Sequence, residues 1–271
     1  MYRRAASGER VCSTCLFNAV VDQVKKALNY FAMVRKGSRV LFVVRPDKPL
    51  ESLIALRVFI KAAKDFDLEI HALCIDGIAP CNEIGSQLQE LVKEVHRYRF
   101  VGDLPSYMHM VKAVSSICAK VAREIDAETC VEPYTRDELT LFALLGILRV
   151  EKEVFSEGLP VKKIDRLKIA RPFYYAISHD IAALTYLRRE LRDLYADTIP
   201  FISFSKSELV VLQGFAKILA GSTELAYSSH KTVELLQSYL IGDSPRCRFC
   251  GAFADSDTCR YCRDLIPVLS A

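Results

Sequence analysis

The chain has 271 residues, of which 51% are hydrophobic and 26% are charged. This balance supports a packed core and excludes wholesale disorder, and the length allows one or two domains. The 37 Lys and Arg residues exceed the 33 Asp and Glu residues by four charges, which permits an anionic partner without requiring one.

The sequence carries no signal for a membrane or for export. No apolar run approaches the roughly 18 residues that span a bilayer, so we expect no membrane-spanning segment and no membrane partner. The beginning, MYRRAASGE, is basic but has no hydrophobic stretch behind it, so no secretory signal is predicted. Ten cysteines without an export signal indicate a reducing compartment, and we expect a cytoplasmic protein.

Strands and helices are predicted to alternate through the first 150 residues. The expected strands are 38–44, 68–75, 98–101 and 129–131, and the expected helices are 50–63, 83–97, 108–125 and 137–148. This alternation is typical of βαβ units, so the predicted fold class is α/β, with a doubly wound, mostly parallel sheet.

The composition changes after Gly146. Residues 151–171 are charged and poor in helix signals, and five cations lie close together against the single acid Asp165: Lys162, Lys163, Arg166, Lys168 and Arg171. Such a cluster can follow the backbone of a nucleic acid, although a charge run is more often a solvated surface.

The last hundred residues are predicted to hold three helices, 178–193, 206–219 and 224–240, before a cysteine-rich tail. We therefore divide the chain into 1–37, a cysteine pair and helix; 38–205, the α/β domain; 206–244, a helical region; and 245–271, a metal-binding ribbon.

Four cysteines in the tail give the strongest motif. Cys247 and Cys250 form one Cys-x-x-Cys pair, and Cys259 and Cys262 form a second pair eight residues later. Each pair can aim two thiolates at one tetrahedral zinc ion, and Gly251 suits the left-handed backbone of such a knuckle. Four thiolates leave no open position, so the predicted zinc is structural; the alternative is four free buried thiols.

Other metal-binding residue types lie scattered. Cys12 and Cys15 have the same spacing but no second pair nearby, so a metal site or a helix start with two small thiols remain the alternatives. The five histidines have no partner at metal-ligand spacing, and we predict surface or packed imidazoles.

The loop after the first predicted strand reads Arg45-Pro46-Asp47-Lys48-Pro49. Doubly wound proteins place a phosphate cradle at this point. Here two prolines lack backbone donors and Asp47 would repel phosphate, so no ATP is expected to bind.

The order of these parts resembles the ATP-pyrophosphatase-type tRNA 2-thiolation proteins. The likeness rests on the cysteine pair before a helix, the strand 39–44, Arg171-Pro172-Phe173 ahead of the helix that starts SHDIA, and the four-cysteine ribbon. It covers nearly the whole chain and implies the degenerate PP-loop form of the α/β fold.

Catalytic members of that family have an S-G-G-x-D-S loop, a later G-H-x-x-D-D-type segment and further cysteines. This chain has the proline-rich loop instead, Glu132-Pro133-Tyr134 after the later strand, and no cysteine between Cys130 and Cys247. The sequence is therefore similar to the non-catalytic cytoplasmic tRNA 2-thiolation protein 2 group.

That resemblance implies a scaffold subunit without catalytic residues, which binds tRNA through the five cations and pairs with a homologous catalytic thiolase during 2-thiolation of the wobble uridine. It also allows a ubiquitin-like sulfur carrier as a further partner. The alternatives are a self-sufficient tRNA sulfurtransferase with an altered active site, and a zinc-ribbon interaction module without an RNA role. Phe201, Phe204, Phe215 and Tyr239 are candidate anchors for the partner, or members of the chain's own core.

Overall fold

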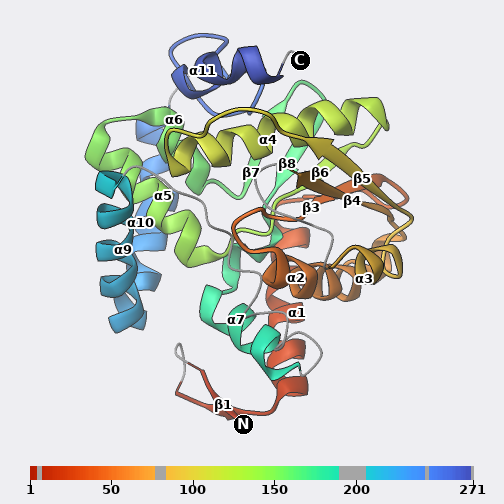
Figure 1. Cartoon of the computed structure of the whole chain (residues 1–271). Coiled ribbons are helices and arrows are strands. Elements are labelled where there is room, and N and C mark those ends of the chain that lie inside the picture. Colours follow the sequence, from red (N-terminus) through yellow and green to blue (C-terminus); the bar gives the residue numbers. More distant parts are fainter. Residues whose placement is uncertain (5–7, 77–83, 189–205, 242–243, 270–271) are drawn as a thin grey trace.

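The computed structural model describes residues 1–4, 8–76, 84–188, 206–241 and 244–269. Its centre is a six-stranded sheet with the order β5-β4-β3-β6-β8-β7 (Figure 1). The strands are β3 (Arg39–Val43), β4 (Glu69–Asp76), β5 (Glu94–Arg99), β6 (Thr129–Val131), β7 (Val161–Ile164) and β8 (Leu167–Ala170). All neighbours pair in parallel except β7 and β8, so the predicted mostly parallel α/β fold is confirmed.

Helices cover both faces of the sheet and continue beyond it. The longer ones are α1 (Ser13–Tyr30), α2 (Pro49–Ala62), α4 (Tyr107–Glu124), α5 (Arg136–Arg149), α7 (Ser178–Leu187), α9 (Lys206–Gly221), α10 (Thr223–Ile241) and α11 (Arg260–Leu269). The shorter elements are β1 (Tyr2–Arg3), β2 (Arg10–Val11), α3 (Gly85–Gln89), α6 (Lys152–Phe155) and the 3-10 turns Lys64–Phe66, Ser156–Gly158 and Pro172–Tyr175.

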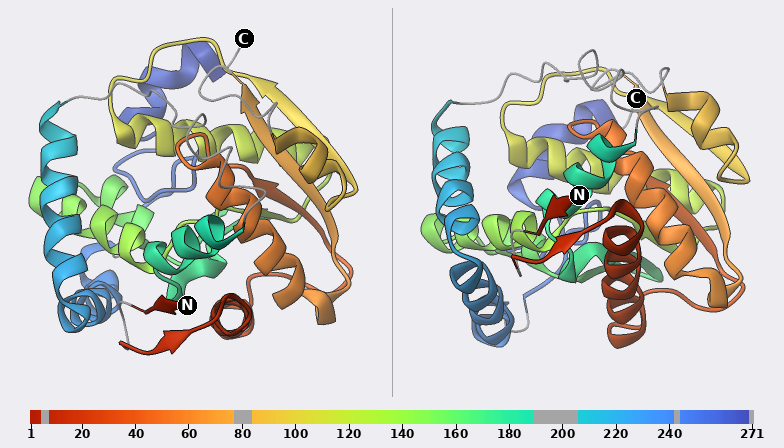
Figure 2. Two further views of the ribbon diagram at one scale, coloured as in Figure 1. Left: turned by 60° about the horizontal axis from the view of Figure 1, so that its bottom comes forward. Right: turned by 90° about the horizontal axis from the view of Figure 1, so that it is seen from below.

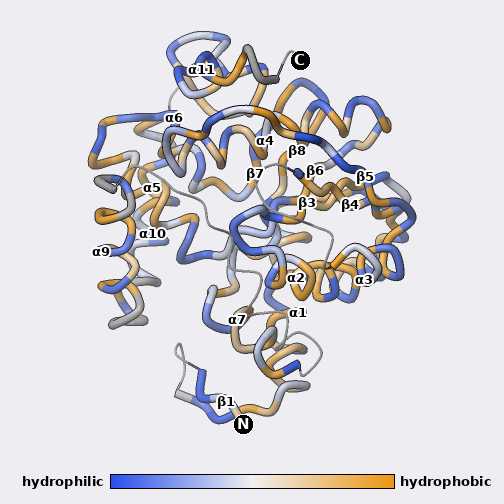
Figure 3. Tube along the Cα trace, in the orientation of Figure 1, coloured by the Kyte–Doolittle hydropathy of each residue, from blue (hydrophilic) through white to orange (hydrophobic). Residues whose placement is uncertain are grey.

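The alternation of side chains along β3 builds two cores. Val40 and Phe42 face α1 and α2, whereas Leu41 and Val43 face α4 on the other side. Both faces of this strand are buried, which explains its continuous apolar run. Figure 3 shows the same concentration of hydrophobic residues along the central strands.

The C-terminal helices lie in two places. Figure 2 shows α9 and α10 along one side of the molecule, away from α3 and β5 at the opposite sheet edge. Helix α11 packs against α4, at the far end of the molecule from the N-terminal hairpin β1–β2 (Figure 1).

Local sequence signals set where the helices begin. Ser106 caps α4 by accepting a hydrogen bond from the backbone N–H of His109. At the start of α5, the backbone N–H and the hydroxyl of Thr135 both donate to the carboxylate of Glu138.

One predicted helix is wrong. Residues 83–97 were expected to be helical, but helix α3 covers only Gly85–Gln89, and Glu94–Arg99 forms strand β5. Val95 and its apolar neighbours fit a helical spacing, but β4 offers a strand edge to which the backbone from Glu94 onward can bond. The sequence pattern also does not predict the β7–β8 hairpin, because Lys162, Lys163 and Lys168 interrupt the apolar residues of its two short strands.

Gly146 in α5 allows the backbone of α6 to approach closely. A Cβ atom there would lie 2.2 Å from the backbone nitrogen of Phe155, where helix α6 crosses α5. We expect Gly146→Ala to lower the free energy of unfolding by about 1–3 kcal/mol, because overpacking forces the backbones apart. The matched control is Gly214→Ala in α9, which has open space around it and should gain about 0.5–1 kcal/mol of helix stability. Urea unfolding measures both; equal effects would contradict the close approach.

Candidate metal centre and carboxyl-end pocket

The four tail cysteines meet in one buried cluster. The ligand atoms of Cys247, Cys250, Cys259 and Cys262 all lie within 4.8 Å of one another, and all four residues are buried. The Sγ atoms of Cys250 and Cys259 are 3.8 Å apart, and the backbone N–H of Cys262 donates to Cys259 Sγ over 3.4 Å. The four thiols can therefore hold one metal ion, with no coordination position left for a substrate.

Gly251 joins this cysteine centre to the β7–β8 hairpin. Its φ is +69°, in the left-handed region, as the knuckle pattern predicts. A Cβ atom would lie 2.8 Å from Ile164 Cγ1 and 3.0 Å from the Lys163 carbonyl oxygen. The first knuckle is thus packed directly against the hairpin.

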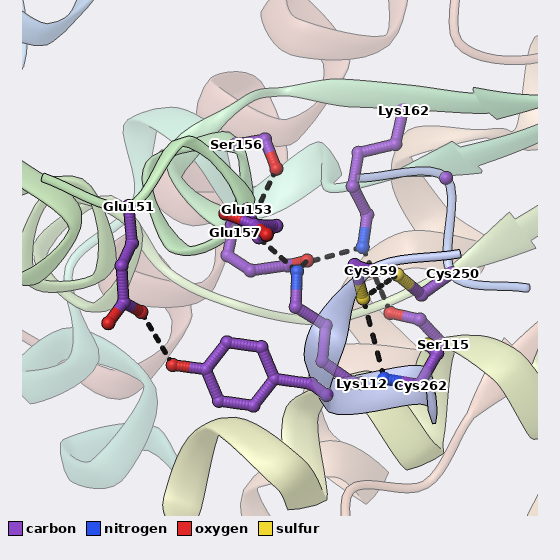
Figure 4. Close-up of polar contacts among 12 residues, drawn as sticks. Lys112, Ser115, Glu151, Glu153, Ser156, Glu157, Lys162, Cys250, Cys259 and Cys262 are labelled. Atoms are coloured by element: carbon purple, nitrogen blue, oxygen red, sulfur yellow. Dashed lines mark hydrogen bonds and ion pairs between the residues drawn. The ribbon is translucent and has the colours of Figure 1, made fainter. Parts of the chain in front are cut away.

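A buried ion network lies beside the cysteine centre (Figure 4). The carboxylate of Glu157, in the turn after α6, contacts the ammonium groups of Lys112 and Lys162 and the guanidinium of Arg171. Arg171 also binds Glu132, with 2.8 Å between Nη2 and Oε2. All five side chains are fully buried, so each charge depends on its partners.

The network carries an excess positive charge, because three cations share two carboxylates. Burial alone raises the pKa of Glu157, but Lys112, Lys162 and Arg171 outweigh it and lower that pKa to about 2. Burial lowers the pKa of Lys112, but Glu157 and the thiolates of Cys250 and Cys259 outweigh it and raise that pKa. The excess cation thus faces the cysteine centre, where it favours the thiolate form that binds metal.

This network corrects the predicted nucleic-acid surface. The expectation that five cations line an exposed path is wrong for Lys162 and Arg171, which are fully buried against Glu157 and cannot reach a phosphate. Lys163 and Arg166 are exposed. Lys168 is half-buried and donates to the carbonyl oxygen of Ala32 over 2.7 Å.

Few sequence features indicate which of these cations are buried. Lys162 and Lys163 alternate along a strand, so one points into the core and the other into solvent. Lys112 lies among the mostly apolar residues of the buried side of α4, and a cation at such a position indicates a buried partner.

The N-terminal cysteine pair lies apart from the cysteine centre. Cys12 and Cys15 are exposed at the start of α1, at the end of the molecule opposite α11 (Figure 1). Cys12 caps this helix, and the hydrogen bond from the backbone N–H of Cys15 lowers the pKa of Cys12. Among the described residues, no third metal-binding side chain joins them.

A second candidate site lies at the carboxyl ends of the parallel strands. A cavity of about 240 Å³ opens between the loop after β3 and the segment after β6, where the connections from the sheet diverge. The polar residues that line it are Arg45, Lys48, Glu51, Ser52, Thr135, Glu138, Ser178 and His179.

The cations of this carboxyl-end pocket are already neutralised. Arg45 binds Glu138 over 2.8 Å and Asp47 over 2.6 Å, and its guanidinium stacks 4.1 Å from the ring centre of Tyr134. Lys48 binds the same Glu138 carboxylate over 2.7 Å. Burial raises the pKa of Glu138, but the two cations outweigh it and hold that pKa well below its usual range. The loop after β3 is thus held in place by ion pairs with Asp47 and with Glu138 of α5.

Two of the four candidate anchors for a partner lie in the described part of the chain. Phe215 is half-buried and Tyr239 is 83% exposed, whereas Phe201 and Phe204 lie outside the described residues. Among the described helices, none combines the length and hydrophobicity needed to cross a lipid bilayer.

Comparison with solved structures shows a strong likeness to a tRNA thiolase. The U34-tRNA thiolase NcsA from Methanococcus maripaludis, solved with its [4Fe-4S] cluster, superposes with a TM-score of 0.74 over 99% of this chain and 93% of that chain, at 15% identity. The chain shares the fold of this thiolase. NAD+ synthetase from Burkholderia pseudomallei matches at a TM-score of only 0.42 and 10% identity, over 84% of this chain and 91% of that one. No family model and no curated protein matches the sequence.

Glu157 provides the test of the buried network. We expect Glu157→Gln to cost about 3–5 kcal/mol at pH 7, because it leaves three buried cations with one carboxylate. The folded pKa of about 2 lies below the unfolded value of 4.5, so the stabilisation is complete above pH 4.5 and is lost as the pH falls toward 2. The stability difference between wild type and variant should therefore shrink over that range in denaturant unfolding.

The matched control is Glu153→Gln. The Lys112 ammonium donates to the backbone carbonyl oxygen of Glu153, and this contact is kept when the side chain changes. A Glu157→Gln variant as stable as this control would contradict the role of Glu157.

Proposed function

We propose that the chain is the non-catalytic subunit of a cytoplasmic tRNA wobble-uridine 2-thiolation complex. It acts there as a scaffold and tRNA-binding partner of a homologous catalytic thiolase, with a ubiquitin-like sulfur carrier as a further partner of the complex. The likeness to a U34-tRNA thiolase over nearly both full chains supports the connection to this reaction. The departures from the catalytic motifs support the scaffold role.

The main support for the non-catalytic role is the loop after β3, whose cations are already ion-paired within the chain. Arg45 is ion-paired with Glu138 and Asp47, and Lys48 is ion-paired with Glu138. Pro46 and Pro49 have no N–H to offer a phosphate. An ATP pyrophosphate group would have to displace Glu138, which also caps α5 through Thr135. The isolated chain therefore does not bind or hydrolyse ATP.

A structural zinc ion fits the cysteine centre better than an iron–sulfur cluster. Zinc–sulfur bonds of about 2.3 Å in a tetrahedron put neighbouring sulfur atoms about 3.8 Å apart, and Cys250 and Cys259 have this spacing. In a four-iron cluster each thiolate binds a different iron, which spreads the sulfur atoms farther than one metal does. Cysteine thiolates within 4.8 Å of one another therefore favour a single ion.

We expect about one zinc per chain in protein purified without oxidation, measured by elemental analysis. Cys250→Ser should lose most of it and destabilise the tail and its contacts with α4, since metal binding contributes folding free energy. The control is Cys118→Ala, a buried cysteine outside the cluster, which should keep its zinc. Iron and sulfide with a visible absorption band would contradict this assignment.

The exposed cations near the cysteine centre form the proposed tRNA surface. Lys163 and Arg166 project from the β7–β8 hairpin, and Arg123 and Arg248 lie beside it. Arg123 Nη2 is 3.7 Å from Asp165 at the hairpin tip and 3.5 Å from the Arg248 carbonyl oxygen, so α4, hairpin and first knuckle meet here. Such contacts position an RNA backbone without reading its sequence.

The catalytic partner is proposed to dock on α9 and α10. Large hydrophobic side chains are exposed on both helices, among them Val210 and Ile218 on α9 and Leu235 and Tyr239 on α10. Several such residues close together are typical of an interaction surface rather than of a free one. The fold of the chain suggests a homologous thiolase as the partner.

Reconstitution tests the proposed function. With ATP and a sulfur donor, the isolated chain should form no 2-thiouridine, whereas the chain together with the catalytic subunit should thiolate tRNA. The double variant Lys163→Ala/Arg166→Ala should weaken tRNA binding, flatten the log–log salt dependence by about 0.7–0.9 for each lost contact, and slow thiolation by the complex. Zinc content and fold should not change.

The matched control is Lys61→Ala/Lys64→Ala, which removes two exposed cations at the end of α2 and in the turn that follows it. An unchanged salt dependence in the hairpin variant would remove the tRNA surface from the proposal. Thiolation by the isolated chain would overturn the scaffold role.

A further inference from the structure

Two histidines and a glutamate that are distant in the sequence meet on the sheet. His71 lies on β4, and Glu94 and His96 lie on β5, where the parallel register pairs His71 with Glu94 and Leu73 with His96. Side chains two residues apart on a strand share a face, so all three lie on the side of the sheet that α4 covers. Helical geometry over 83–97 would have pointed Glu94 and His96 apart.

The three ligand atoms form a compact triangle. His71 Nδ1 is 2.9 Å from His96 Nε2, and Glu94 Oε2 is 3.9 Å from His71 Nδ1 and 3.7 Å from His96 Nε2. Bonds of about 2.0–2.1 Å to a tetrahedral ion put neighbouring ligand atoms about 3.3 Å apart, which lies between these values. The triangle thus needs shifts of only a few tenths of an ångström to surround one ion.

We propose that His71, Glu94 and His96 form a second metal site, which binds a divalent transition-metal ion such as Zn²⁺ through two imidazole nitrogens and one carboxylate oxygen. Imidazole ligands favour Zn²⁺ and its transition-metal neighbours over Mg²⁺ or Ca²⁺. Three protein ligands leave a position open for water or for a group from a partner.

Glu69 prepares His71 for this role. Its Oε1 lies 3.0 Å from His71 Nε2, and its carboxylate is held by Arg39 and by Lys93. A carboxylate is an obligate acceptor, so His71 carries its proton on Nε2 and presents a bare Nδ1 lone pair to the other ligands. A carboxylate behind a ligating histidine is the usual support of such sites.

Without metal, the same atoms satisfy one another by hydrogen bonding. His96 Nε2–H then donates to the bare His71 Nδ1. For metal binding, the His96 proton moves from Nε2 to Nδ1 of the same ring. His96 Nε2 is then free to bind the ion, and both imidazoles remain neutral.

The new site lies far from the groups used in the proposed function. It lies near the amino ends of β4 and β5, whereas the carboxyl-end pocket lies at the opposite ends of the parallel strands. β5 is one of the two edge strands of the sheet (Figure 1). An ion held by His71, Glu94 and His96 would tie this edge strand to β4.

Equilibrium dialysis of the full chain with Zn²⁺ tests the proposal after the cysteine centre is filled. Wild type should take up one further zinc per chain. His96→Gln should weaken this uptake more than 10-fold, and Glu69→Gln should weaken it by about 10–100-fold while the stoichiometry stays the same. His179→Gln is the matched control, because that exposed histidine is outside the triangle and should change nothing.

The double variant Cys12→Ser/Cys15→Ser separates this site from the N-terminal thiols and should keep the further ion. Co²⁺ at the new site should show no sulfur-to-metal charge-transfer band, because its ligands are nitrogen and oxygen. No further zinc in wild type, equal uptake by His96→Gln, or loss only in the cysteine variant would each overturn the proposal. None of these results depends on tRNA or on the catalytic partner.

Discussion

The carboxylate of Glu157 is the point on which the C-terminal half of this structure depends. It forms ion pairs with cations from three separate segments: Lys112 in α4, Lys162 in β7 and Arg171 after β8. Without it the β7–β8 hairpin would bring unpaired charges into the core, and the hairpin is also the surface on which the first cysteine knuckle packs. One buried acid therefore links the sheet edge, α4 and the metal centre.

The same principle of charge pairing applies in the loop at the carboxyl end of β3. Glu138 accepts hydrogen bonds from Arg45 and Lys48 and also caps α5. A carboxylate from α5 thus occupies the cations that would otherwise attract a phosphate. The fold keeps the place where α/β proteins bind ligands, but the charges there are paired within the chain.

Local patterns predicted the parts of the fold that are governed by nearby residues. The strand at 129–131 and the helices around α2, α4 and α5 follow from apolar periodicity and capping residues, and the cysteine spacing predicted the cluster at 247–262. The prediction was wrong over 83–97 because its apolar residues fit a helix and an edge strand alike. Only the free edge of β4 decides between them.

The sequence by itself determined the α/β class, the proline-rich loop after the first strand and the four thiols that can share one metal, since each depends on residues close together in the chain. Only the tertiary structure decided which charges are exposed and which distant residues meet. Lys162 and Lys163 are neighbours, yet the pleat of β7 buries one against Glu157 and exposes the other. His71 and His96 are 25 residues apart, yet the parallel register brings them within 2.9 Å. Strand pairing is a long-range choice, and no short stretch of sequence encodes it.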